Sequence, residues 1–392
     1  MFLRLSQLGL VLCLATVVAC PQKKKAAHVD PPSTEPPAAT VKAEVSTISG
    51  IPSGIPVYTR PGPTPPPPTR PDKAVKVPDK AKVKVPDAPR PPRRDNYARD
   101  TSERMIPADA NVAVKLCVSD GDVKINGTEK NEVRVFVRNG RKFEFRSLEK
   151  NPETGKANWI WLARATDGTP AAGQFVNCLS GDSIEIDLPL RGSIMIEGRS
   201  ATVNIDSVTK ATVKLIEGDI SLRNIPGGVF ARTEQGELFA ESIAGEIGLE
   251  TTTGNIVAYD LKTARPGEPL RVTTIRGTIS LQNISHRQIE ANATSGSVKY
   301  VGTFVGGGIY KFRTASGRIG LLLPADLNCV ISASYGFGNF DSSFPLKIIT
   351  ETRSDGGKSL VGHLGNGKGP VVNLSTTSGS IRLVKQGEVD LP

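Results

Sequence analysis

The sequence predicts an all-β fold for residues 105–392, a single-stranded β-solenoid or β-roll built from glycine-cornered strand repeats of about 18–23 residues. Three observations predict this class. Glycine recurs at nearly constant spacing, apolar residues alternate with polar ones on both sides of it, and threonine recurs three places before it. The recurring glycines are Gly218, Gly236, Gly254, Gly277, Gly296, Gly317 and Gly379.

The residues around each glycine predict two strands joined by a tight turn. Apolar side chains stand two and four places after the glycine, and five and seven places before it, so every offset keeps the strand period of two. Repeats this short cannot bury a face alone and must stack on their neighbours. A β-sandwich is the alternative, and it predicts less regular spacing. The residues three places before the last six glycines are Thr233, Thr251, Thr274, Ala293, Thr314 and Thr376, with alanine as the exception.

Three further segments complete the domain. An earlier copy of the repeat centres on Gly121 and continues through the aliphatic stretches at 184–186 and 194–196. The aromatic segment 140–178 departs from the repeat, and residues 342–369 form a Gly-rich, polar insertion before the last copy. No helix of consequence is expected.

The N-terminus reads as an export signal. Residues 1–19 contain Arg4 and then a short apolar run that ends Val17-Val18-Ala19-Cys20. This ending resembles the lipobox of bacterial lipoprotein signal peptides, which implies cleavage before Cys20 and acylation of its thiol. An ordinary signal peptide with an incidental Cys20 is the alternative. Pro21 is not the aspartate associated with inner-membrane retention, which favours the outer membrane.

Residues 20–104 are predicted to be a disordered spacer. Residues 21–95 hold 19 of the 30 prolines, and the segment shows almost no apolar periodicity. It carries most of the net charge of +10, since residues 1–104 have 17 Lys and Arg against 9 Asp and Glu. We expect a solvated stalk between a membrane and the repeat domain, either as a passive tether or brushing anionic cell-wall polymer.

The repeat region resembles a known family. The Thr-x-x-Gly-x-aliphatic units, Leu321-Leu322-Leu323-Pro324 after Gly317, and the closing segment from Gly362 through Leu374 to Ile381 are similar to the bacterial putative-adhesin β-strand-repeat family, also called toastrack-like. The resemblance covers residues 110–385. It implies the solenoid fold and an adhesin-like role. The family carries no agreed catalytic residues, so it implies none here.

Composition argues against several functions. Residues 105–392 carry 32 Lys and Arg against 30 Asp and Glu, so no nucleic-acid partner is expected. The three histidines are far apart, which argues against a metal site, and no cofactor is expected. Acids that follow corner glycines, such as Asp182 and Asp219, are explained by turn chemistry. The sequence therefore predicts no catalytic residues.

Two residue pairs are candidate features of the domain. Trp159 and Trp161 share one face of a strand, where they form either an exposed binding hot spot or a plug over the open end of the solenoid. Cys117 and Cys178 stand in matching sequence contexts, so they are either bridged or remain buried thiols, while Cys329 is expected to be a buried thiol.

The predicted function is a non-catalytic, envelope-anchored, adhesin-like binding or scaffold protein on a lipid-anchored stalk. Its partners are then the membrane, through the anchor, and an envelope polymer or protein. Two alternatives stay open: a sensor or scaffold that modulates a membrane signalling partner, and a polysaccharide-active β-helix enzyme.

Overall fold

The computed structural model describes residues 100–165 and 177–387, which form 24 β-strands. Within these ranges there is no helix, and so none that could span a membrane. The predicted signal peptide, Cys20 and the spacer up to residue 99 lie outside the described residues. The predicted all-β solenoid is confirmed.

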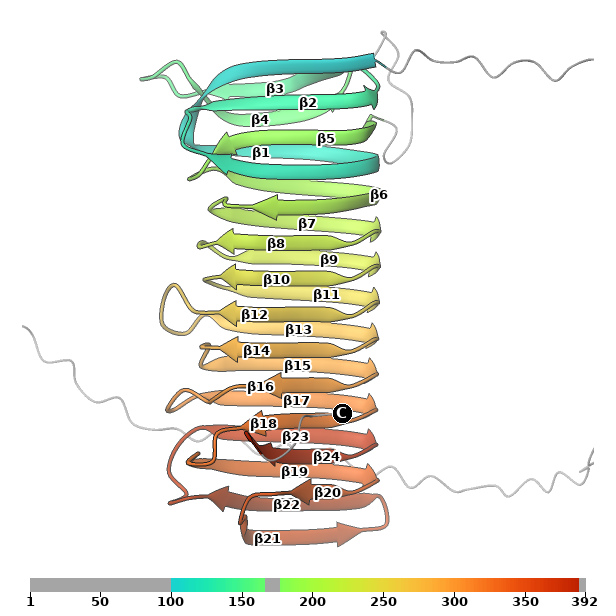
Figure 1. The fold of residues 1–392 in the computed structure, drawn as a ribbon, viewed down its shortest axis with the longest axis vertical. Coiled ribbons are helices and arrows are strands. Elements are labelled where there is room, and N and C mark those ends of the chain that lie inside the picture. Colours follow the sequence, from blue (N-terminus) through green and yellow to red (C-terminus); the bar gives the residue numbers. More distant parts are fainter. Residues whose placement is uncertain (1–99, 166–176, 388–392) are drawn as a thin grey trace, which may run out of the picture. The chain divides into compact units, whose positions relative to one another are not determined.

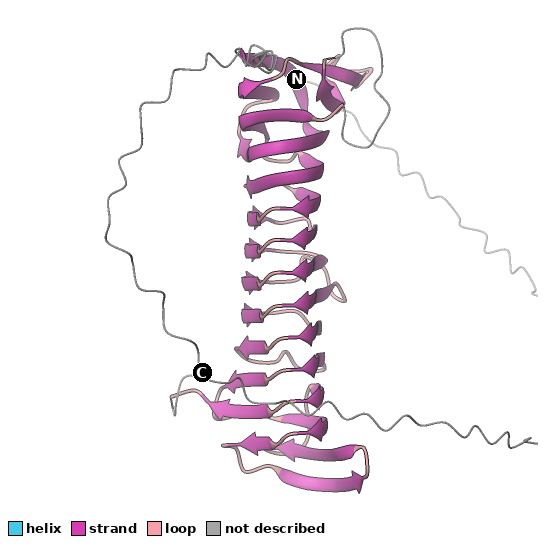
Figure 2. Ribbon diagram, turned by 90° about the vertical axis from the view of Figure 1, so that its right-hand side faces the viewer, coloured by secondary structure: helices cyan, strands magenta, loops and turns pink. Residues whose placement is uncertain are grey.

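The strands form two facing stacks, and each regular repeat adds one strand to each (Figures 1 and 2). Pairing is parallel except at the two ends, and β1 and β6 bend at a corner to serve both stacks. Stack A contains, in spatial order, β3 (Phe143–Lys150), β4 (Ala157–Arg164), the middle of β1 (Asp100–Thr128), the start of β6 (Ser193–Asp206), β7 (Lys210–Glu217), β9 (Val229–Gln235), β11 (Ile247–Thr253), β13 (Pro269–Arg276), β15 (Gln288–Ser295), β17 (Ile309–Ser316), β23 (Val371–Ser378), β19 (Cys329–Phe337), β22 (Gly357–Leu364) and β21 (Lys347–Ser354). Stack B contains the start of β1, β2 (Glu132–Gly140), β5 (Leu179–Pro189), the end of β1, the end of β6, β8 (Ile220–Ile225), β10 (Leu238–Ile243), β12 (Ile256–Leu261), β14 (Ile279–Ile284), β16 (Val298–Val301), β18 (Ile319–Leu323), β24 (Ile381–Lys385) and β20 (Phe340–Ser342).

The corner glycines are required by both conformation and space. Gly236 and Gly254 have φ angles of 150° and 152°. A Cβ on Gly254 would overlap the carbonyl oxygen of Gly236, one repeat earlier, and the same overlap recurs along the corner. Only glycine allows this left-handed conformation together with so close an approach.

The recurring threonines complete this corner. Each lies in stack A with its side chain buried. The hydroxyls of Thr233, Thr251, Thr274 and Thr314 donate a hydrogen bond to the carbonyl oxygen of the corner glycine one repeat earlier, whereas the Thr376 hydroxyl has no partner among the described residues. The distances are 3.1 Å for Thr251 to Gly236 and 3.1 Å for Thr274 to Gly254. Because an unpaired buried hydroxyl or carbonyl costs free energy, the threonine and the glycine carbonyl satisfy each other.

A second corner lies at the end of the stack B strand in several repeats. Asn224, Ser242, Asp260 and Asn283 each stand six places after a corner glycine and adopt positive φ angles of 54–55°. The side chains also bond along this corner, as Asn224 does to Asp206 at 2.9 Å. The next residue in each repeat is a buried aliphatic. The residue types at this corner were visible in the sequence, since Asn, Asp and Ser tolerate this conformation. The corner itself interrupts the strand period of two.

The core lies between the two stacks. Ile256 and Ile279 are fully buried, whereas Asp219 and Arg318, at the opposite phase of the pattern, are exposed. The predicted inward and outward phases are therefore confirmed. Towards the C-terminal end, larger side chains fill the same space: Tyr300, Phe304, Tyr310 and Phe312 pack with ring centroids 4.4–6.5 Å apart.

Antiparallel strands cover the N-terminal end. The start of β1 pairs with β2, and β3 pairs with β4. The first described strand starts at Asp100, and residues 100–104, which precede the expected start of the domain at residue 105, pair with β2. Much of the irregular segment 140–178 is the β3–β4 hairpin.

The C-terminal end departs from chain order. The last repeat, β23 and β24, lies between the repeat of β17 and β18 and that of β19 and β20 (Figure 1). The predicted insertion forms β21 and β22, which continue stack A beyond β19 as an antiparallel pair. The last repeat in the sequence therefore lies between two repeats that precede it in the chain.

Candidate binding surface

The outward surface of stack A, here called face A, carries a row of mostly apolar side chains near its N-terminal end. Strand register places these residues directly beside one another on five consecutive strands, β4, β1, β6, β7 and β9. We call them the aromatic row: Trp161, Lys115, Met195, Thr212 and Phe230. Met195 is 43% exposed, so much of its side chain is open to contact from outside.

The two tryptophans that the sequence analysis considered as a hot spot or a plug lie at the start of this row. Ile160 and Leu162 point into the core, so Trp159 and Trp161 point outward, and both are half-buried. The Arg146 guanidinium lies 5.7 Å from the centroid of the Trp161 ring, and the buried Trp161 Nε1 has no partner among the described residues. It is Phe143, rather than either tryptophan, that lies buried in the end of the core.

A hollow of about 680 Å³ adjoins the row across β6, β7 and β9. Its volume lies within the usual range for ligand pockets. Ile216 and Phe230 supply apolar surface, and Glu197, Lys214 and Arg232 supply charge. Two of these charges also have partners, since Glu197 lies 3.6 Å from Lys115 and Arg232 lies 3.8 Å from Glu250. The arrangement offers a broad contact area more than an enclosed site.

The cysteines have different environments. Cys117 lines the hollow on face A, and its Cα lies 4.6 Å from that of Cys178, with the two sulfur atoms at bonding distance. This separation is within the range of disulfides. Cys329 is a buried free thiol, and burial raises its pKa to about 12. A thiol with so high a pKa is a poor nucleophile at neutral pH.

The acids considered for catalysis are spread along the solenoid. Asp219 accepts a hydrogen bond from the Glu237 backbone N–H at 2.7 Å, which is a structural role at the corner. Asp182 accepts one from the Asn139 amide at 2.9 Å. In residues 100–165 and 177–387, no three His, Cys, Asp or Glu side chains are grouped as a metal site would need.

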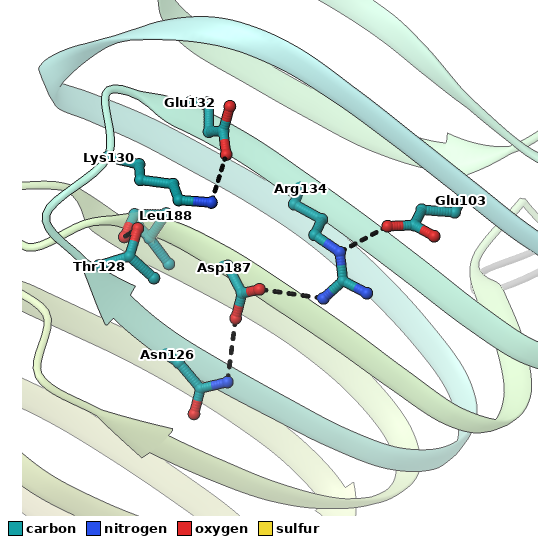
Figure 3. A network of polar contacts seen from close by, with 8 residues as sticks. All are labelled: Glu103, Asn126, Thr128, Lys130, Glu132, Arg134, Asp187 and Leu188. Carbon is teal, nitrogen blue, oxygen red and sulfur yellow. Dashed lines mark hydrogen bonds and ion pairs between the residues drawn. The ribbon is translucent and has the colours of Figure 1, made fainter.

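The outward surface of stack B, here called face B, begins with a polar network (Figure 3). Arg134 on β2 lies 2.5 Å from Glu103 and 3.1 Å from Asp187, which in turn accepts a hydrogen bond from Asn126 at 3.0 Å. Hydrogen bonds to Glu103 and Asp187 raise the pKa of Arg134. The network ties β1, β2 and β5 together at the end of the stack.

Sequence reasoning missed most of the aromatic row. Met195 and Phe230 stand at outward positions of their strands, where the repeat pattern expects polar or small residues. This departure from the pattern could have been noticed in the sequence. The strand register that brings Met195 and Phe230 into one row with Trp161 and Lys115 could not be predicted from it.

The repeat domain matches a known protein family. The family model described as Toastrack DUF4097 matches residues 108–384. Two solved structures are similar at low identity: a putative cell adhesion protein from Clostridium sporogenes (10% identity, 73% of this chain and 100% of that chain, TM-score 0.20) and a putative adhesin from Bacteroides fragilis (11% identity, 73% and 98%, TM-score 0.30). No curated protein matches the sequence.

Proposed function

Because the chain belongs to the Toastrack DUF4097 family, we propose that it is a non-catalytic, adhesin-like binding protein of the bacterial cell envelope. The observation that carries the proposal is the aromatic row with its adjoining hollow on face A. Trp, Met, Phe and Arg are the residue types enriched at protein interfaces. A flat sheet that presents them suits a shallow, extended contact with an envelope protein or polymer.

The non-catalytic part of the proposal is supported by the chemistry of the described residues. The acids act at corners and in ion pairs, and the free thiol Cys329 is buried with a raised pKa. A nucleophile needs an adjacent base or a lowered pKa, and Cys329 has the opposite.

The location is proposed from the N-terminal sequence. Acylation of Cys20 would anchor the mature chain in a membrane, and the proline-rich segment would hold the solenoid away from it. We favour the outer membrane.

Binding by face A can be tested on an array of envelope glycans and proteins probed with the full-length chain. We expect Met195→Ser and Phe230→Ser to weaken any specific signal at least about tenfold, because a few anchor residues near the centre of an interface carry most of the binding energy. Ile309→Ser is the matched control, since Ile309 is a 47% exposed apolar residue on face A outside the row. Equal losses in all three variants would contradict the proposal.

The anchor is tested separately. Mass spectrometry of membrane-extracted protein should find Cys20 as the acylated N-terminus, and Cys20→Ala should move the protein out of the membrane fraction. A mature N-terminus at any other residue would contradict the anchor without affecting face A.

A further inference from the structure

Face B carries a second hollow, of about 270 Å³, on the opposite side of the solenoid from the aromatic row. It spans the end of β1, the end of β6 and β8. Its outward-facing lining is polar: Lys124, Asn126, Asn204, Asp206, Ser221 and Arg223. The geometry points to a binding site for a neutral oligosaccharide, made by this hollow and the aromatic side chains beside it.

Aromatic rings border the hollow on the next two strands. Register places Phe239 of β10 directly beside Ser221, and Tyr259 of β12 directly beside Glu241. The two rings meet edge to face with centroids 5.3 Å apart, and both are half-buried. Half-buried rings on a flat sheet offer the apolar surface against which the apolar face of a sugar ring packs.

The polar groups are held in place before any ligand arrives. The Arg223 Nε lies 3.2 Å from the Glu241 carboxylate, and its guanidinium lies 5.3 Å from the Phe239 centroid. Glu241 also accepts the Tyr259 hydroxyl hydrogen bond, which raises the pKa of Tyr259. One carboxylate therefore orients both an arginine and a tyrosine, which lowers the entropic cost of binding.

Unused hydrogen-bonding capacity remains in the hollow. The side chains of Lys124, Asn204 and Ser221 have no hydrogen-bond partner within residues 100–165 and 177–387, and Arg223 keeps its terminal NH2 groups beyond the Nε contact. A sugar hydroxyl both donates and accepts, so it needs partners of both kinds. Asn204 and Ser221 offer both, and Lys124 and Arg223 donate.

Charge decides between a neutral and an anionic ligand. Lys124 has Glu185 as its neighbour across the sheet, and Arg223 has Asp206 on one side and Glu241 on the other. The two cations thus have three acids as neighbours, so the hollow has no positive electrostatic potential that would attract a polyanion. A neutral glycan fits this balance, whereas nucleic acid and anionic cell-wall polymer do not.

The inference goes beyond the proposed function because it uses the opposite face and names the ligand chemistry. Isothermal titration of the full-length protein with cellohexaose, mannohexaose and chitohexaose tests it, with a heparin hexasaccharide as the anionic probe. We expect at least one neutral hexasaccharide to bind with a Kd of about 1 mM or tighter. No neutral binding at millimolar concentration, or binding of heparin alone, would overturn the inference.

Variants locate the site. Asn204→Ala and Arg223→Ala should each weaken binding at least about fivefold, and Phe239→Leu should do so while keeping an apolar side chain against the sheet. The control Ser280→Ala lies in the same row as Phe239, two strands further along, and should bind normally. Unchanged affinity in the first three variants, or an equal loss in Ser280→Ala, would overturn the placement. Met195→Ser should leave this titration unchanged, so failure on face A and failure on face B are distinguishable.

Discussion

At the scale of single residues, the corner threonine shows how one hydroxyl serves the fold. The hydroxyl donates to a glycine carbonyl oxygen that a Cβ on the next corner glycine would overlap. The hydrogen bond and the absence of a side chain at that corner therefore depend on each other. Where the repeat departs from threonine, the pairing is lost. Ala293 occupies that position between Thr274 and Thr314, and it is 5% exposed.

Replacing that alanine should therefore stabilise the protein. Ala293→Thr places a hydroxyl where its neighbours donate to corner glycines, so we expect a gain of about 0.5–1.5 kcal/mol in the free energy of unfolding. Thr274→Ala is the reverse change and should cost a similar amount. Denaturant melts measure both. A loss of stability in Ala293→Thr would mean that the core cannot accommodate the added atoms.

His286 should make stability depend on pH. The ring is fully buried, Nε2 lies 2.9 Å from the Gly245 carbonyl oxygen, and Nδ1 has no partner among the described residues. Burial lowers the pKa of His286, despite the opposing charge of Glu268. Because the unfolded state then binds the proton more readily, the contribution is complete above pH ~6.5 and is lost as the pH falls below it.

Melting temperatures between pH 7.5 and 5.5 measure this dependence. The wild-type Tm should fall with acidification, and the fall should be smaller in His286→Gln. His363→Gln, which leaves the buried ring in place, should retain the wild-type slope. Identical slopes for His286→Gln and the wild type would contradict the assignment.

At the scale of elements, the alternation of inward and outward residues is what each strand contributes. Ile256→Ala and Ile279→Ala each remove a fully buried side chain and should cost roughly 2–4 kcal/mol. Arg318→Ala is exposed and should cost under about 0.5 kcal/mol. Asp219→Ala should cost somewhat more than Arg318→Ala, because Asp219 accepts a backbone hydrogen bond. Comparable losses at Ile256 and Arg318 in denaturant melts would contradict the register.

Much of this scale was predictable from the sequence. The glycine spacing predicts the strands and their buried faces, since burial and φ preference act locally. The second corner was not predicted, because Asn224 and its equivalents shift the phase of the pattern by one residue. Of the aromatic row, only Trp161 was predicted as a candidate binding residue.

At the scale of the whole repeat domain, the two ends of each stack decide whether solenoids join edge to edge. In stack A the last strand, β21, is exposed along its length, and its register with β22 shifts between Ile348 and Thr350. Lys347, Glu351 and Arg353 add charge along it. Irregular pairing and charge are the usual protection of an edge strand. In stack B the last strand, β20, is only three residues long.

The pair Cys117 and Cys178 gives a further prediction for the N-terminal end. A bond between them would close a loop with a sequence separation of 61, so its loss should cost about 2–4 kcal/mol. Dithiothreitol should lower the Tm of the wild type and leave the double variant Cys117→Ser, Cys178→Ser unchanged. A wild-type Tm that is insensitive to the reductant would contradict the bridge.

The sequence by itself determined the all-β class, the repeat, the glycine corners and the inward residues, because each follows from local sterics and from a period that any single repeat displays. Tertiary structure alone decided that β23 lies between β17 and β19, and that Trp161, Met195 and Phe230 share one row while Arg223, Phe239 and Tyr259 share the other face. The physical reason is register. Neighbours across a stack are set by hydrogen bonding between strands far apart in the chain, and local spacing does not encode which strands pair.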